Sequence, residues 1–139
     1  MKHPKPVYPS AEDVEAAFYA AFSRCDLEVM RNLWVRGDVV CVHPGAEPIQ
    51  GYEAVVRSWR HIFSGAERPN VQIKIIQSIV SDDLVMHMVE EHIGSSAAPH
   101  QGAVVFATNV YRRNGQGWLM VAHNASVVRT RQAQSQTLQ

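Results

Sequence analysis

His43 is the residue of this sequence whose surroundings most favour chemistry. It ends the β-rich run 38–43 and stands directly before the turn that Pro44 and Gly45 indicate. A partly buried imidazole at the floor of a pocket could act as a general base near neutral pH. The alternative is a structural histidine whose ring bonds a neighbouring carbonyl beside the turn, and the sequence leaves both open.

Asn109 is a second candidate because it is a polar amide on an apolar face. In an extended strand it shares that face with Val105, Ala107 and Tyr111. A buried amide needs hydrogen-bond partners. Asn109 could therefore donate to the carbonyl of a ligand, or it could tie two strands or a helix end together.

Two adjacent carboxyl groups, Glu90 and Glu91, must lie on opposite faces of a regular strand, so one of them faces inward. Glu90 alternates with residues 84, 86, 88 and 92, and Glu91 alternates with residues 85, 87, 89 and 93. A carboxyl group that is desolvated in a pocket has a raised pKa and could serve as an acid or a base. An ion pair with an arginine or a histidine is the structural alternative.

Metal and phosphate-loop chemistry are not indicated. The chain has seven histidines, and His43 with Glu47, or Glu90 with His92 and His123, could be considered as ligands. None of these sets has the fixed spacing of a known metal motif. No glycine-rich phosphate loop is present either. We therefore expect neither a metal nor another cofactor.

The elements that position these residues follow from hydrophobic periodicity. Apolar residues recur at helical spacing in residues 10–24, 26–37 and 51–65, with the short β-rich run between the second and third helices. Alternation then predicts strands over 71–80, 84–93, 103–113 and 118–128, and residues 114–117 give a hairpin signal. Helices followed by an antiparallel meander are typical of an α+β fold with the helices on one face of the sheet.

A long sheet that bends around three helices leaves a cone, and its open end is where a small-molecule pocket would form. The other face of the sheet also alternates apolar residues, which one chain alone could not bury. We therefore expect a homodimer packed sheet to sheet.

Composition narrows the class of protein. A chain of 139 residues is the size of one domain. Its 13 basic and 13 acidic residues cancel, which argues against a nucleic-acid-binding module. No apolar run approaches the roughly 20 residues that span a bilayer. The first residues lack the apolar stretch of a signal peptide, so we expect a cytoplasmic protein.

Three segments together resemble the SnoaL-like branch of the nuclear transport factor 2-like superfamily. They are the helical segment 18–34, the stretch 43–51 with the following helix that contains Trp59, and residues 107–126 of the last two strands. The resemblance covers residues 10–128 and implies one cystatin-like cone. The proline-rich residues 1–9 and the polar, glutamine-rich residues 129–139 are expected to be flexible tails. This fold hosts isomerases, dehydratases, hydrolases and non-enzymatic proteins, so it implies no single reaction.

The ketosteroid isomerases are the best-defined members of the superfamily, and their active site does not match. Their general base is a carboxylate before a proline at the end of the first strand, where this chain has His43. Their oxyanion hole pairs a tyrosine with a protonated aspartate, and these positions fall on Phe18 and Asn109. Phenylalanine has no donor for a dienolate oxygen. Ketosteroid isomerase activity is therefore not expected.

The resemblance also implies which residues meet the pocket. It favours Glu90 as the inward carboxyl group, and matching the hairpin to the isomerases places Asn124 inside. His87 and His123 then fall on the outer face, which implies loss of the dimer below about pH 6 as buried neutral histidines become charged. The aromatic residues expected at the pocket wall are Phe18, Trp34, Tyr52 and Trp59.

The sequence therefore predicts a protein that binds a small apolar or aromatic molecule. As an enzyme it would use acid/base chemistry without a cofactor: isomerisation, dehydration or hydrolysis next to a carbonyl. His43 would take the proton, Glu90 would assist, and Asn109 would hold the oxyanion. The pattern also resembles the association domain of calmodulin-dependent kinases, so the alternative is a non-catalytic ligand-binding or oligomerisation module. A third possibility is a cone filled by its own tryptophan and methionine side chains, with no ligand.

Overall fold

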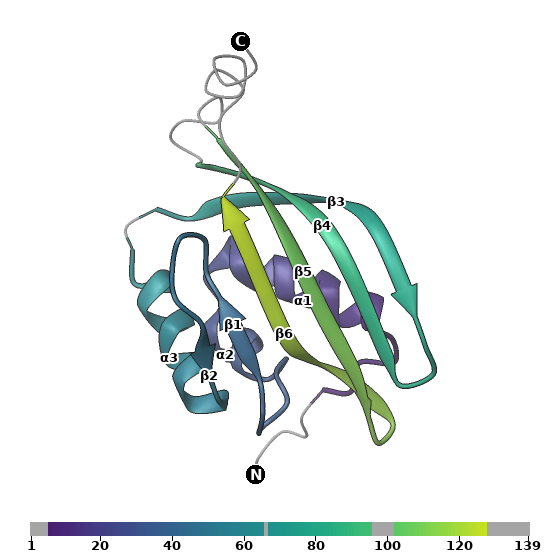
Figure 1. The fold of residues 1–139 in the computed structure, drawn as a ribbon. Coiled ribbons are helices and arrows are strands. Elements are labelled where there is room, and N and C mark those ends of the chain that lie inside the picture. Colours follow the sequence, from purple (N-terminus) through teal and green to yellow (C-terminus); the bar gives the residue numbers. More distant parts are fainter. Residues whose placement is uncertain (1–5, 66, 96–101, 128–139) are drawn as a thin grey trace.

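In the part of the chain that the structure describes, three helices lie against one face of a six-stranded sheet (Figure 1). The computed structural model describes residues 6–65, 67–95 and 102–127; the rest of the expected tails and most of the loop between the middle strands lie outside this range. The helices are α1 (Ala11–Arg24), α2 (Leu27–Arg31) and α3 (Tyr52–Phe63). The strands are β1 (Val40–Val42), β2 (Ile49–Gln50), β3 (Pro69–Val80), β4 (Leu84–Ser95), β5 (Ala103–Asn114) and β6 (Gly117–Val127). The expected α+β fold is confirmed.

Side-chain caps fix where the first two helices begin. The Ser10 hydroxyl accepts a hydrogen bond from the Asp13 amide at 3.1 Å, and the Asp26 carboxyl group accepts one from the Val29 amide at 3.1 Å. Each cap satisfies an amide that has no partner within its helix. Between the two helices, Cys25 takes a left-handed conformation with φ of 55° and ends α1.

The second helix is shorter than the sequence predicts. It ends at Arg31 instead of continuing toward Gly37, because the next residues hydrogen-bond to β6. The Met120 amide donates to the Leu33 carbonyl at 2.7 Å, and the Val35 amide donates to the Met120 carbonyl at 2.9 Å. These two bonds hold Trp34, which lies between them in the chain, against the inner side of the sheet.

The strands have the order β2-β1-β6-β5-β4-β3. The last four form the expected antiparallel meander, whose final turn contains Gly115 at a φ of +65°. The short strand β1 pairs parallel to β6 and antiparallel to β2. The two-residue strand β2 was not expected from the sequence, because it is too short to show any alternation.

A β-bulge in β6 corrects the expected facing of its residues. Tyr111 pairs with Met120, but the preceding Val110 pairs with Ala122, so one residue of β6 is extra. The bulge shifts the alternation by one position. Met120 and His123 therefore both face inward and are buried, while Asn124 is exposed on the outer face. The expectation that Asn124 faces the interior and His123 the dimer face is wrong for this reason.

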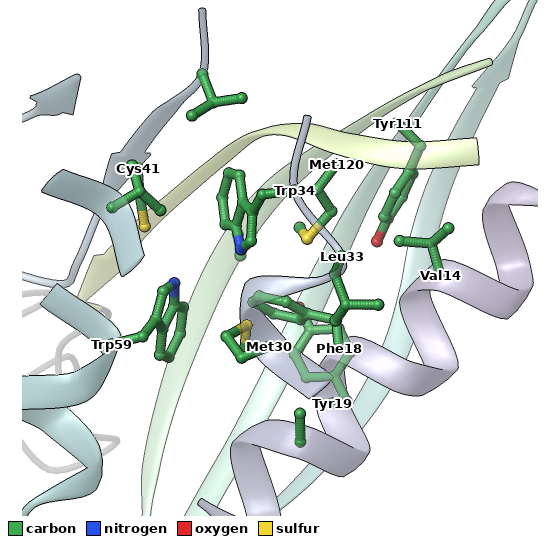
Figure 2. Close-up of a cluster of buried hydrophobic side chains, with 14 of the residues drawn as sticks. Val14, Phe18, Tyr19, Met30, Leu33, Trp34, Cys41, Trp59, Tyr111 and Met120 are labelled. Atoms are coloured by element: carbon green, nitrogen blue, oxygen red, sulfur yellow. The ribbon is translucent and has the colours of Figure 1, made fainter. Parts of the chain in front are cut away.

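The hydrophobic core lies between the helices and the inner face of the sheet. Figure 2 shows Val14 and Phe18 of α1 packed with Met30, Trp34 and residues of the strands. Two methionines and two tryptophans, Met30, Met120, Trp34 and Trp59, are each at most 1% exposed, as a cone filled by such side chains would require. No helix in the described part of the chain is long and apolar enough to cross a membrane.

Candidate functional site

Four residues with hydrogen-bonding or nucleophilic side chains form a row across the inner face of the sheet. His87 on β4 lies opposite Asn109 on β5, Asn109 lies opposite His123 on β6, and His123 lies beside Cys41 on β1. All four are at most 1% exposed. Because directly paired residues project to the same face of a sheet, the register alone brings these side chains together beneath the helices.

A chain of hydrogen bonds extends from this row to α1. Asn109 accepts at Oδ1 from His123 Nδ1 at 2.6 Å and donates from Nδ2 to the Tyr19 hydroxyl at 2.8 Å. The Tyr19 hydroxyl donates to Glu91 Oε2 at 2.6 Å. Because Asn109 Oδ1 can only accept, the proton of neutral His123 is on Nδ1, which leaves Nε2 as an acceptor. We call the residues Tyr19, Glu91, Asn109 and His123 the inner network.

Burial controls the charges of the inner network. It raises the pKa of Glu91 to about 7, although the hydrogen bond from Tyr19 partly opposes this rise. Burial also lowers the pKa of His123 to about 3, with a smaller contribution from His43. His123 is therefore neutral at pH 7, and Glu91 changes its protonation near neutral pH.

A second buried group lies next to the inner network. The Glu15 carboxyl group on α1 accepts hydrogen bonds at Oε2 from His87 Nδ1 at 2.7 Å and from the Tyr111 hydroxyl at 2.9 Å. All three side chains are buried. The expectation that His87 lies at a dimer face is therefore wrong: its ring is bound to α1 inside the subunit. The predicted loss of a dimer at low pH has no basis once both histidines face inward.

His43 lies at the end of β1 and is half-buried. Its Nε2 lies 2.9 Å from Ser58 Oγ, and the Ser58 hydroxyl donates its own proton to the Val55 carbonyl at 2.7 Å. His43 Nε2 must therefore be the donor, which leaves Nδ1 as an acceptor at neutral pH. Burial lowers the pKa of His43. The structural alternative named a neighbouring carbonyl as the partner of the ring, whereas the observed partners of Nε2 are the Ser58 hydroxyl and, at 3.7 Å, Cys41 Sγ.

Aromatic rings pack between His43 and His123. The centroid of the Phe18 ring lies 5.1 Å from that of the His123 ring, 5.4 Å from that of Trp59 and 6.5 Å from that of Trp34. The His43 ring contacts Trp59 edge-on at 4.8 Å. Phe18, Trp34 and Trp59 thus belong to the hydrophobic core, and their expected place in the wall of a ligand pocket stays a prediction.

The two buried tryptophans carry unsatisfied donors. Within the described residues, Trp34 Nε1 and Trp59 Nε1 are buried and have no hydrogen-bond partner. An unpaired buried donor costs about 1–3 kcal/mol. Such groups in a folded protein call for an explanation.

Three expected site residues lie elsewhere. Glu90 is on the outer face, with its carboxyl group 3.4 Å from His92, and Glu91 takes the inward position because β4 is regular there and faces inward at residues 85, 87, 89 and 91. Asn124 is exposed. Tyr52 donates from its hydroxyl to the Arg31 carbonyl at 2.6 Å and lies under the Arg36 guanidinium at 5.0 Å, so it does not join the interior.

Sequence reasoning did not single out Tyr19, and it placed Glu91 and His123 on the outer face of the sheet. Tyr19 follows Phe18, the position that the isomerase comparison tested, and Glu15 and Tyr19 are four residues apart on one side of α1. A polar pair at that spacing, beside an apolar stripe, is a signal for a helix that carries buried polar groups. Glu91 had its own signal, because the residues that alternate with it include Val85, Val89 and Ile93.

A cleft of about 380 Å³ opens at the end of the sheet where the chain begins. Its wall includes Tyr8, Trp34, Val35, Trp118 and Leu119. Trp34 thus forms part of the wall between this cleft and the interior. In the described part of the chain, no three histidine, cysteine or acidic side chains come together in a way that could hold a metal ion.

The sequence profile of the SnoaL-like domain matches residues 11–130. With the cone-like α+β architecture, this match shows that the chain belongs to the SnoaL-like family, within the nuclear transport factor 2-like superfamily. No curated protein matches the sequence.

Solved structures give the same fold with different descriptions. One from Thiobacillus denitrificans, provisionally described as a calcium/calmodulin-dependent protein kinase type II association domain, is 42% identical, covers 89% of this chain and 99% of its own, and has a TM-score of 0.82. One from Streptomyces avermitilis, provisionally described as a dehydratase of the NTF2-like family, is 33% identical, covers 84% and 92%, and has a TM-score of 0.76. A ketosteroid isomerase-like protein from Erwinia carotovora atroseptica is 17% identical over 86% and 94%, with a TM-score of 0.71, and is similar in fold alone.

Proposed function

We propose that this SnoaL-like protein binds a small apolar carbonyl compound and catalyses proton transfer at the carbon next to the carbonyl, without a cofactor. One observation carries the proposal: two neutral imidazoles, His43 and His123, lie against one cluster of aromatic rings that contains Trp59 and Phe18. Isomerisation, dehydration and some hydrolytic reactions share such a proton transfer as their first step.

His43 is the better general base of the two. A catalytic base works best when its pKa lies near the working pH. The pKa of His123 is too low for this, because that ring is fully buried. His43 is only half-buried, and its hydrogen bond to Ser58 fixes the tautomer that leaves Nδ1 free to accept a proton.

Asn109 takes a different role from the one expected. Its Oδ1 accepts from His123 and its Nδ2 donates to Tyr19, so both ends of the amide are used within the inner network. We therefore assign Asn109 and Glu91 to positioning His123 and not to holding an oxyanion. The S. avermitilis structure described as a dehydratase supports this class of chemistry for this protein.

Proton transfer can be tested without knowing the substrate. Cyclopentanone in D₂O exchanges its α-protons slowly, and NMR follows this exchange directly. We expect the protein to accelerate the exchange and His43→Ala to lower the acceleration by about a hundredfold or more, since general bases contribute 10²–10⁴-fold. His61→Ala, an exposed histidine on α3, is the matched control. Acceleration that survives in His43→Ala would rule out His43 as the base.

A second candidate function is assembly. It is favoured by the 42% identity to the structure described as a kinase association domain, and by apolar side chains on the outer face of the sheet. Met88 is 40% exposed and Phe106 is 39% exposed on neighbouring strands. This surface supports a homodimer through the outer sheet face.

Light scattering tests the assembly. We expect a dimer or larger oligomer that Phe106→Lys shifts to the monomer, because a charge cannot be buried without a partner. Ile62→Lys places the same charge on an exposed apolar position of α3 and is the control. A wild-type monomer at high concentration would contradict the proposed homodimer and remove the support for an assembly role.

A further inference from the structure

The two unpartnered indole groups come from different elements and face the same space. Trp34 follows α2 and is held by the backbone bonds to Met120, whereas Trp59 lies on α3. Both rings pack edge-on against Phe18. In Figure 2 the two indole nitrogens, drawn in blue, point toward one another across the space between Cys41 and Met30. Each tryptophan is 1% exposed, so solvent does not satisfy the donors.

The surroundings define the kind of acceptor that these donors suit. Each indole can only donate, and Cys41 and Met30 offer sulfur atoms that accept weakly. The buried residues in the described part of the chain include no lysine or arginine. His123 is neutral, because burial lowers its pKa to about 3. A carboxylate would therefore be buried without a counter-charge, which is unfavourable. A carbonyl oxygen has two lone pairs, carries no full charge and matches two converging N–H groups.

We propose that Trp34 Nε1 and Trp59 Nε1 together bind the carbonyl oxygen of an uncharged small molecule. This inference rests on the proposed function and names the group of the ligand that is recognised. The centroid of the Trp59 ring, which supplies one donor, lies 4.8 Å from that of the His43 ring, so the proposed base is next to the proposed carbonyl site.

Indole NMR tests this site directly, because the chain has three tryptophans. The third, Trp118, lies in the cleft wall and is an internal control. We expect cyclopentanone to shift the indole N–H signals of Trp34 and Trp59 downfield, as hydrogen bonding does. Methylenecyclopentane has the same shape without an acceptor and should not shift them downfield. Loss of one signal in each of Trp34→Phe and Trp59→Phe assigns the spectrum.

The same two variants measure the contribution of each donor. Phenylalanine keeps an aromatic ring but removes the N–H, so each variant should weaken cyclopentanone binding about three- to tenfold and leave methylenecyclopentane binding unchanged. Trp118→Phe should change neither. Unshifted Trp34 and Trp59 signals, or shifts confined to Trp118, would overturn the proposal. If the first two variants fail to fold, Trp118→Phe still identifies the Trp118 signal, and the other two signals are then those of Trp34 and Trp59.

The inference and the proposed function can fail separately. Downfield indole shifts without any accelerated α-proton exchange would leave the carbonyl site standing and remove the catalytic function. Accelerated exchange without these indole shifts would leave the catalytic function standing and remove the carbonyl site.

Discussion

Replacing Glu15 by alanine should destabilise the protein by about 3–5 kcal/mol, the usual cost of removing one partner from a buried polar pair. Glu15 is 5% exposed, and its carboxyl group is the acceptor for both His87 and Tyr111. The variant leaves two buried donors without that acceptor and opens a cavity beneath α1. A loss of this size is a large fraction of the 5–15 kcal/mol typical of a whole domain.

Denaturant unfolding at neutral pH measures the effect. Glu12→Ala is the matched control, since Glu12 is an exposed carboxyl group in the first turn of the same helix and interacts with little more than the helix dipole. It should cost no more than about 1 kcal/mol. Glu15→Gln keeps one acceptor oxygen and should fall between the two. An alanine variant within 1 kcal/mol of wild type would show that water or a rearranged side chain replaces the carboxyl group.

The fold could be predicted from the sequence because its elements are long and regular. The periodicity around Phe18 and Trp59 is helical over several turns, and the four long strands alternate clearly. The Ser10 and Asp26 caps could also be predicted, since each acts within three residues. What failed were features decided by distant contacts. The end of α2 depends on hydrogen bonds between residues 33–35 and β6, which no local pattern contains.

The candidate site was harder to predict because a shift of one residue in strand register changes which side chains face inward. One extra residue in β6 exchanges the faces of His123 and Asn124. Which of Glu90 and Glu91 faces inward also depends on register. The resemblance favoured Glu90, whereas the apolar residues of β4 alternate with Glu91, the carboxyl group that is buried. Asn109 was placed correctly on an inward face because β5 is regular around it. Its partners, on α1 and β6, could only be seen in three dimensions.

Glu91→Gln should change how the stability of the protein depends on pH. The folded state raises the pKa of Glu91 from 4.5 to about 7, so its contribution to stability is complete below pH 4.5 and is lost as the pH rises through 7. The folded state lowers the pKa of His123 from 6.5 to about 3, so its contribution is complete above pH 6.5 and is lost as the pH falls toward 3. Between pH 4.5 and 6.5 Glu91 lowers the free energy of unfolding as the pH rises and His123 raises it. The pH dependences due to these two groups therefore nearly cancel in this range.

The Glu91→Gln variant removes the pH dependence due to Glu91 and keeps the one due to His123. Relative to wild type, its free energy of unfolding should therefore increase with pH, by about 3 kcal/mol between pH 4 and pH 8. Denaturant unfolding at several pH values measures this difference, and Glu90→Gln removes a carboxyl group from the outer face of the same strand as the control. The amide also keeps an acceptor for the Tyr19 hydroxyl, so the inner network stays connected. A difference that stays constant with pH would show that folding does not raise the pKa of Glu91, and the buried carboxyl group would then have to be charged at neutral pH.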